Sequence, residues 1–311
     1  MNAVITITMN PAVDKSSSVE RIVPNDKLRC SQPSYDPGGG GLNVSRVLSK
    51  LDCSSLAIYT NGGPTGKLLN KLLQEEKNIE LMPTELEAWT RENLLVIESS
   101  TSNQYRFGMP GPDIKTTEWQ AVISNLEKSI KDARYLVASG SLPPGVPIDF
   151  YRQLSEIAST HGVRFILDTS GQALSEGLKH HCYLIKPNLR ELRQLTGRTL
   201  MHEAEQEEAA EALVHEGKVE VVVLSLGSAG ALLVTKDIKQ RLRSPTVPIV
   251  SKVGAGDSML GGIVFGLLHN MNMINSVQYG IACSASTVSS PGTQLCNKDE
   301  VERIFQRIVA G

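Results

Sequence analysis

Between residues 111 and 230, short and almost continuously apolar segments alternate with longer amphipathic ones. Strands that are buried on both faces are apolar along their length, and parallel strands need a connection of about a dozen residues or more, usually a helix. The alternation therefore predicts an α/β fold with a mostly parallel central sheet covered by helices on both faces. The expected strands are residues 135–139, 164–168, 183–185 and 219–226, and the expected helices are residues 118–130, 149–159, 189–195 and 203–215.

The same pattern continues on both sides of this region. Apolar runs predict further strands, and apolar residues at helical spacing predict further helices. The last two helices are nearly all apolar, so we expect them to be deeply packed. The strands are residues 4–9 and 55–60, and the helices are residues 42–51, 66–77, 257–268 and 276–288.

Two segments interrupt the alternation. Residues 17–35 and 92–109 are extended, rich in turn residues and half polar, and residues 10–36 as a whole carry few strand signals. The second segment predicts a β-hairpin that turns at residues 101–103. We expect one domain over residues 1–311, with a small β-lid inserted from two places, about 15–37 and 88–110.

The charge balance excludes several classes of partner. With 31 basic and 33 acidic residues, the net charge of −2 gives no support for binding to nucleic acid or to a membrane surface. No apolar run approaches the ~20 residues that span a bilayer. The five cysteines are scattered without a C-x-x-C pair, which indicates free thiols and a cytoplasmic location. An anionic ligand must therefore be held by local charges.

The segment Val253-Gly254-Ala255-Gly256-Asp257 precedes an apolar helix. Glycines without Cβ atoms let backbone N–H groups approach a phosphate, and a helix N-terminus adds a partial positive charge. Asp257 could accept a hydroxyl proton there while the amides hold a transferring phosphoryl group. The alternative is a glycine loop with an aspartate that caps its helix.

Two segments at expected strand ends are candidate nucleotide or metal sites. Asn188 and Glu191 have the spacing of a capping box, or else place an amide and a carboxylate where they could hold a hydrated Mg²⁺, with Lys186 facing phosphates. The turn from Ser225 through Gly227 to Gly230 is either a ligand loop at a strand end or a tight hairpin.

Four consecutive glycines, residues 38–41, precede Asn43 and a helix. Glycines are costly to order, so close approach of a ligand to the backbone is the favoured interpretation over a plain turn. The segment is not a dinucleotide fingerprint, and residues 62–67 only superficially resemble a phosphate-binding P-loop. Basic residues on the expected lid are candidate phosphate ligands, although each alone is usually a solvated charge: Lys27, Arg29 and Arg91.

In this order along the chain, the glycine run, the Lys-Pro-Asn-x-x-Glu segment, the Ser-Leu-Gly turn and the Gly-Ala-Gly-Asp segment resemble the PfkB-type carbohydrate kinases of the ribokinase-like superfamily. The resemblance covers essentially the whole chain. It is strongest to members that act on fructose 6-phosphate, through residues 27–30, 36–43, 89–93, 104–111 and 139–145.

The resemblance implies transfer of a phosphoryl group from ATP, with Mg²⁺, to the C1 hydroxyl of fructose 6-phosphate, and a homodimer formed through the β-lid. Its sugar-phosphate ligands would be Asp14, Lys27, Arg29, Gly39, Gly40, Asn43, Arg91 and Ser141. Its nucleotide ligands would be Lys186, Asn188, Ser225, Gly227 and Gly230, with Glu191 for Mg²⁺. A monovalent-cation loop for K⁺ would comprise Ser251, Val253, Thr287, Ser290, Gly292 and Gln294.

Two alternatives remain at this point. Tagatose 6-phosphate or fructose 1-phosphate could be the substrate, because these sugars differ from fructose 6-phosphate in one stereocentre or in the position of the phosphate. A catalytically silent sugar-phosphate sensor is an alternative of another class, against which the intact Gly254–Asp257 segment argues.

Overall fold

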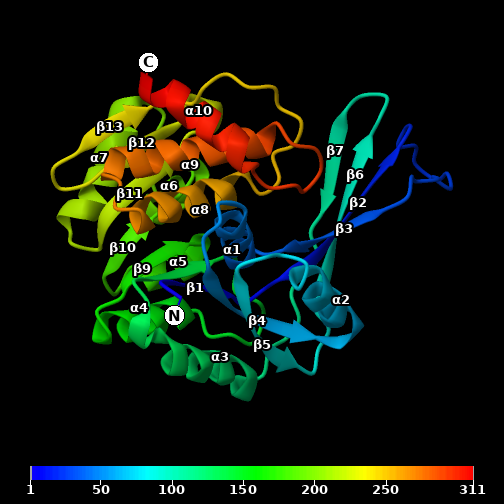
Figure 1. Ribbon diagram of the computed structural model, residues 1–311, viewed down its shortest axis with the longest axis horizontal. Helices are drawn as coiled ribbons and strands as arrows, with labels where there is room; N and C mark the ends of the chain where they lie inside the picture. Colours follow the sequence, from blue (N-terminus) through cyan, green and yellow to red (C-terminus); the bar gives the residue numbers. More distant parts are fainter. Residues whose placement is uncertain (1, 311) are drawn as a thin grey trace.

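The computed structural model describes residues 2–310, and within them a nine-stranded sheet forms the centre of the molecule (Figure 1). The strand order is β13-β12-β11-β10-β9-β8-β1-β4-β5, and all neighbours are parallel except those that involve β12. The strands are β1 (Val4–Thr8), β4 (Ser55–Gly62), β5 (Ile79–Leu86), β8 (Tyr135–Ser139), β9 (Arg164–Asp168), β10 (Cys182–Ile185), β11 (Val219–Ser225), β12 (Ala231–Val234) and β13 (Lys239–Leu242).

Helices cover both faces of this sheet, as the alternation predicts. One face packs against α3 (Thr116–Ser129), α4 (Phe150–Thr160), α5 (Gly171–Gly177), α6 (Leu189–Thr196) and α7 (Glu203–His215). The other packs against α1 (Gly40–Lys50), α8 (Ala255–Leu268), α9 (Met273–Val288) and α10 (Lys298–Ala310), with α2 (Gly63–Leu73) beside β4. No helix in the described part of the chain is both long and apolar enough to cross a bilayer.

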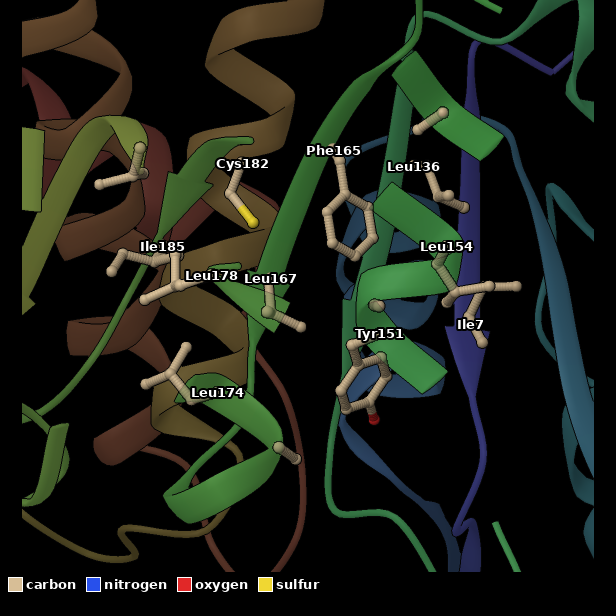
Figure 2. Close-up of a cluster of buried hydrophobic side chains, with 14 of the residues drawn as sticks. Ile7, Leu136, Tyr151, Leu154, Phe165, Leu167, Leu174, Leu178, Cys182 and Ile185 are labelled. Carbon is tan, nitrogen blue, oxygen red and sulfur yellow. The ribbon is translucent and has the colours of Figure 1, made fainter. Parts of the chain in front are cut away.

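On the first face, apolar side chains of the strands and helices form one continuous buried cluster. Figure 2 shows Phe165 and Leu167 of β9 facing Tyr151 and Leu154 of α4, all of them buried. The Tyr151 hydroxyl donates a hydrogen bond to the carbonyl of Gly140 (2.8 Å), at the carboxyl end of β8. This contact ties α4 to the edge of the sheet at which the candidate site residues lie.

A second sheet of four strands, in the order β3-β2-β6-β7, projects from the body (Figure 1). It comprises β2 (Ala12–Val19), β3 (Ser34–Gly38), β6 (Arg91–Glu98) and β7 (Asn103–Phe107). We call it the lid sheet. The predicted hairpin is confirmed by the antiparallel pairing of β6 with β7. The expectation that residues 10–36 hold few strands is wrong, because polar β2 pairs with both β3 and β6, and the sheet begins at Ala12.

The strand registers give the lid sheet two different faces. Asp14 is paired with Asp36 and Asn93, so these three side chains lie on one face. The neighbouring positions point to the opposite face, which joins four residues across all four strands: Tyr35, Lys15, Leu94 and Phe107. The first face is largely polar and carries charges of both signs, and the second is more apolar.

The predicted strands in the centre of the sheet match the observed ones within one or two residues. Four elements were not anticipated: β5, α5, β13 and α10. Edge strand β5 is half exposed and carries Pro83, so it lacks the apolar run of a buried strand. Helix α2 begins three residues before the predicted helix because Pro64 suits its first turn.

Candidate active site

The carboxyl ends of the central parallel strands all lie at one edge of the sheet, where open α/β sheets bind ligands. The candidate residues Ser141, Lys186 and Ser225 lie after β8, after β10 and at the end of β11, and Asn10, which was not a candidate, follows β1. The first turn of α8 reaches the same edge. The fold therefore brings together segments that are up to about 250 residues apart in the sequence, namely those at Asn10 and Asp257.

Asp257 lies in the first turn of α8, where the amide groups are not used by the helix. Gly254 is the N-cap residue with φ of 73°, a left-handed conformation that favours glycine. Asn43 Nδ2 donates a hydrogen bond to Asp257 Oδ2 (2.8 Å). Burial raises the pKa of Asp257 to about 6, with nearby Asp168 acting in the same direction and Asn43 and Lys186 opposing it. A carboxyl with this pKa is ionised near neutral pH and suited to accept a proton.

Lys186 and Asp168 form an ion pair next to Asp257. Their charged atoms are 3.3 Å apart, and only 6% and 15% of the two side chains is exposed. Burial lowers the pKa of Lys186, but Asp168, Asp257 and Glu191 more than offset this and leave it raised. Asp168 was missed in the sequence, although it is the last residue of a predicted strand and so had to lie at this edge of the sheet.

The segments around Asn188 and Ser225 are neighbours. Ser225 donates its backbone N–H to the Pro187 carbonyl (2.9 Å), which continues the pairing of β10 with β11 beyond the strands. Asn188 caps α6, and Glu191 accepts from the Asn188 backbone, so the capping box is present. The turn to Gly230 is also the predicted hairpin. Burial raises the pKa of Glu191, and the hydrogen bonds with Asn188 lower it.

The four glycines are required by the protein's own packing. A Cβ on Gly38 would collide with the Asp14 carboxylate, and one on Gly40 would collide with Ser139. Gly39 has φ of 121° and begins α1. The sequence interpretation favours close approach of a ligand over a plain turn, and the packing of the glycines against the protein itself is a reason that it did not consider. They let α1 begin in contact with the ends of β1 and β8, and this places Asn43 beside Asp257.

Three of the candidate sugar-phosphate residues make hydrogen bonds close to one another: Asp14 pairs with Asn93, and Arg91 and Ser141 both bond to Asn10. Asn93 Nδ2 donates to Asp14 (2.8 Å), and burial raises the pKa of Asp14 while Asn93 and Arg91 lower it. Arg91 donates to the carbonyls of Asn10 and Met109 (3.0 Å each). Among the described residues its buried Nε has no hydrogen-bond partner. Ser141 accepts from Asn10 Nδ2 (3.0 Å), so it lies close to Arg91 as well.

A cavity of about 210 Å³ lies between the lid sheet and the core. Asp14, Asn93 and Arg106 line it from the lid sheet, and Val253 and Thr293 line it from the core. Arg106 was not singled out in the sequence, although alternation along β7 places it on the same face as Asp14. The cavity adjoins the α8 N-terminus through Val253.

Lys27 and Arg29 do not join this group. They lie in the exposed loop of residues 20–33, at the far end of the lid sheet (Figure 1). Within residues 2–310 neither makes a hydrogen bond or an ion pair. These two residues could contact a ligand at Asp257 only if the loop moved or if they reached the site of a second copy of the chain.

The candidate cation residues form a compact pair of loops. Ser251 donates its hydroxyl to the Gly292 carbonyl and its backbone N–H to the Val288 carbonyl. The Thr287 hydroxyl donates within the core to Ser258 (2.7 Å), so its backbone carbonyl, and not its side chain, is nearer to the loop. Ser290 and Gln294 complete the turn through their backbone N–H groups.

The comparisons with known proteins agree with this geometry. The chain matches the family described as pfkB family carbohydrate kinase over residues 1–300. It is 43% identical to ATP-dependent 6-phosphofructokinase isozyme 2 of Mycobacterium tuberculosis, covering 97% of this chain and 89% of that protein. Crystal structures of phosphofructokinase-2 from Escherichia coli superpose with TM-scores of 0.95, in complex with potassium, and 0.93, in complex with fructose-6-phosphate. They are 38% and 37% identical, and each alignment covers 99% of this chain and 100% of the other. The chain therefore belongs to the pfkB family of carbohydrate kinases.

Proposed function

We propose that the chain transfers the γ-phosphoryl group of ATP to the C1 hydroxyl of fructose 6-phosphate, giving the 1,6-bisphosphate. The observation that carries the proposal is the partly buried Asp257 carboxylate at the α8 N-terminus, in a chain 43% identical to a 6-phosphofructokinase. A base and a set of free amides at one point are what phosphoryl transfer to an alcohol requires.

The chain's own residues have separate roles in this reaction. Asp257 accepts the proton of the C1 hydroxyl, and the backbone amides of Gly254, Ala255 and Gly256 hold the oxygens of the transferring group. Asp14, Asn43, Arg91 and Ser141 bind the sugar phosphate, beside the backbone of Gly39 and Gly40. Asp14 lines the cavity, Asn43 donates to Asp257, and Ser141 and Arg91 both bond to Asn10. MgATP supplies the phosphoryl group when it is bound.

The nucleotide side of the site fits ATP and a divalent metal. Lys186 offers a buried ammonium group, and Ser225, Gly227 and Gly230 form a turn directly beside Asn188. Glu191 and Asp168 are carboxylates near that ammonium group, suited to a hydrated Mg²⁺. The loops at Ser251 and Gly292 would hold a monovalent cation next to the α8 N-terminus.

We also propose that the lid sheet pairs with the lid sheet of a second copy. Its outer face exposes aromatic and apolar side chains, which a second copy would cover: Tyr35 at 38%, Tyr105 at 36% and Phe107 at 48% exposed. A two-fold pairing would bring the exposed loop of one chain, with Lys27 and Arg29, toward the site of the other. The β-lid would then close the active site and join the two subunits.

The proposed substrate is tested by coupled assays of ADP release with three sugar phosphates. Fructose 6-phosphate should give the highest kcat/KM, ahead of tagatose 6-phosphate and fructose 1-phosphate. A higher kcat/KM with either of the other two would assign the chain to a sister activity. ATP binding without turnover of any of the three would favour the sensor.

The role of Asp257 is tested by Asp257→Asn. Loss of a general base should lower kcat by about 10²- to 10⁴-fold. The affinity for ATP should stay within a few-fold, because the amides at the helix N-terminus remain. With the wild type, kcat should fall about tenfold per pH unit below about pH 6, where Asp257 becomes protonated. Turnover of the variant within tenfold of wild type, or a flat profile down to pH 5, would contradict the assignment.

Glu191→Gln separates the helix cap from a metal role. Glutamine can also complete a capping box, so the melting temperature should change little, with a cost of at most ~1 kcal/mol. The lost charge should raise the Mg²⁺ concentration needed for half-maximal activity. Glu205→Gln is the matched control, since Glu205 makes the same capping box in α7. If both variants need the same Mg²⁺ concentration, Glu191 only caps the helix and has no metal role.

Hybrid dimers test the proposed contribution across the subunit interface. Arg29→Ala subunits mixed with Asp257→Asn subunits should regain activity, because one site of each hybrid then has both Asp257 and a partner with Arg29. Arg91→Ala should lower kcat/KM for the sugar roughly 10- to 150-fold. It should not be rescued by the same mixing, because Arg91 lies in the same chain as its site. Rescue of both variants, or of neither, would contradict this arrangement.

A further inference from the structure

Arg46 is a buried arginine of α1 whose guanidinium group makes four contacts, to β3, to the segment after α2 and to its own helix. Only 6% of its side chain is exposed. Its Nε donates to Glu76, after α2 (2.7 Å), and its terminal NH1 nitrogen donates to the carbonyl of Pro37 in β3 (2.9 Å). The other terminal nitrogen is 3.9 Å from the Asp36 carboxylate. Neither the motifs nor the proposed reaction uses this residue.

The fourth contact connects Arg46 to the proposed base. NH1 of Arg46 also donates to Asn43 Oδ1 (3.2 Å), and the nitrogen of the same amide donates to Asp257 Oδ2 (2.8 Å). A carboxamide has one accepting and one donating end, about equal in size, and it can rotate by half a turn. Since Arg46 can only donate, it favours the rotamer in which the Asn43 nitrogen faces Asp257. With the opposite rotamer, two oxygens would face each other at the carboxylate.

We propose that Arg46 is a positioning residue for the phosphoryl transfer. It holds the Asn43 amide with its nitrogen toward Asp257 and so keeps that carboxylate ionised and correctly oriented. The inference rests on the proposed function of Asp257. It adds that the lid sheet is part of the same arrangement, because Arg46 takes its own position from Asp36 and Pro37 of β3.

Several other charged groups face these side chains and must be considered in a test based on pH. Asp257 is influenced by Asp168, Lys186 and Asp14, and the hydrogen bond from Asn43 lowers its pKa. Arg46 faces Asp36 and Glu76. Replacement of Arg46 by lysine keeps a positive charge among these groups. It removes the planar set of donors that reaches Pro37, Asn43 and Glu76 together, so it tests geometry apart from charge.

The experiment measures kcat against pH for Arg46→Lys and Arg46→Gln. Loss of the oriented amide raises the pKa of Asp257, so the acid limb should move to higher pH by about one unit or more in both variants. The loss in kcat should be largest at low pH and shrink as pH rises, and KM for ATP should change little. An unmoved acid limb would overturn the proposal, even if kcat falls.

Two controls separate this route from simple destabilisation and from direct charge effects. Arg241→Gln removes another arginine that joins separate elements, through Glu207 (2.9 Å) and Glu203, and should lower stability without moving the acid limb. In an Asn43→Ala background, Arg46→Lys should cause no further shift. A further shift there would mean that Arg46 acts on Asp257 without Asn43, and the proposal would fail.

The wild-type protein provides a measurement that needs no variant and no activity. Neutron diffraction of its deuterium-exchanged crystals should show deuterium atoms on the Asn43 nitrogen directed at Asp257. The Asn43 atom next to Arg46 should carry none. The reverse orientation would overturn the proposal whatever the substrate is. The correct orientation in a chain without kinase activity would instead count against the proposed function alone.

Discussion

The partial burial of one carboxylate constrains much of this structure. Asp257 is partly buried, which makes an unpaired charge costly, and its raised pKa of about 6 reflects that cost. Three features make the charge tolerable: the amides of the α8 N-terminus, the hydrogen bond from Asn43 and the nearby ammonium group of Lys186. Each comes from a different element, so α1, α8 and the end of β10 must be held together for the site to exist.

The glycine run shows how that requirement is met by the backbone. Gly38 and Gly40 have neighbours where a Cβ would have to lie, namely Asp14 and Ser139. The chain can therefore pass from the lid sheet into α1 in direct contact with the ends of two central strands. Bulkier residues would push α1 away from the edge of the sheet and separate Asn43 from Asp257. In this fold the glycines serve the site by allowing close packing of protein against protein.

Features that depend on neighbouring residues in the chain could be predicted from the sequence. Features that depend on residues far apart in the chain could not. The apolar run at residues 135–139 and the cap at Asn188 are local patterns, and both were predicted. Asp168 and Arg106 were missed because their importance comes from neighbours brought by other strands. Edge strand β5 was missed because a half-exposed strand lacks a clear pattern. The Asn43–Asp257 bond joins residues 214 positions apart, which no spacing rule predicts.

The alternation of faces along the lid sheet has a consequence for how such proteins change over time. Asp14 and Lys15 are adjacent in sequence, yet one faces the site and the other the outer surface. Substitutions at outward positions such as Tyr35, which does not line the cavity, can therefore accumulate without touching the residues around it. Descendants of one ancestor could in this way diverge in quaternary structure while keeping the same chemistry. An insertion of a single residue within β2 would instead disrupt the site, because every side chain beyond it would move to the other face of the lid sheet.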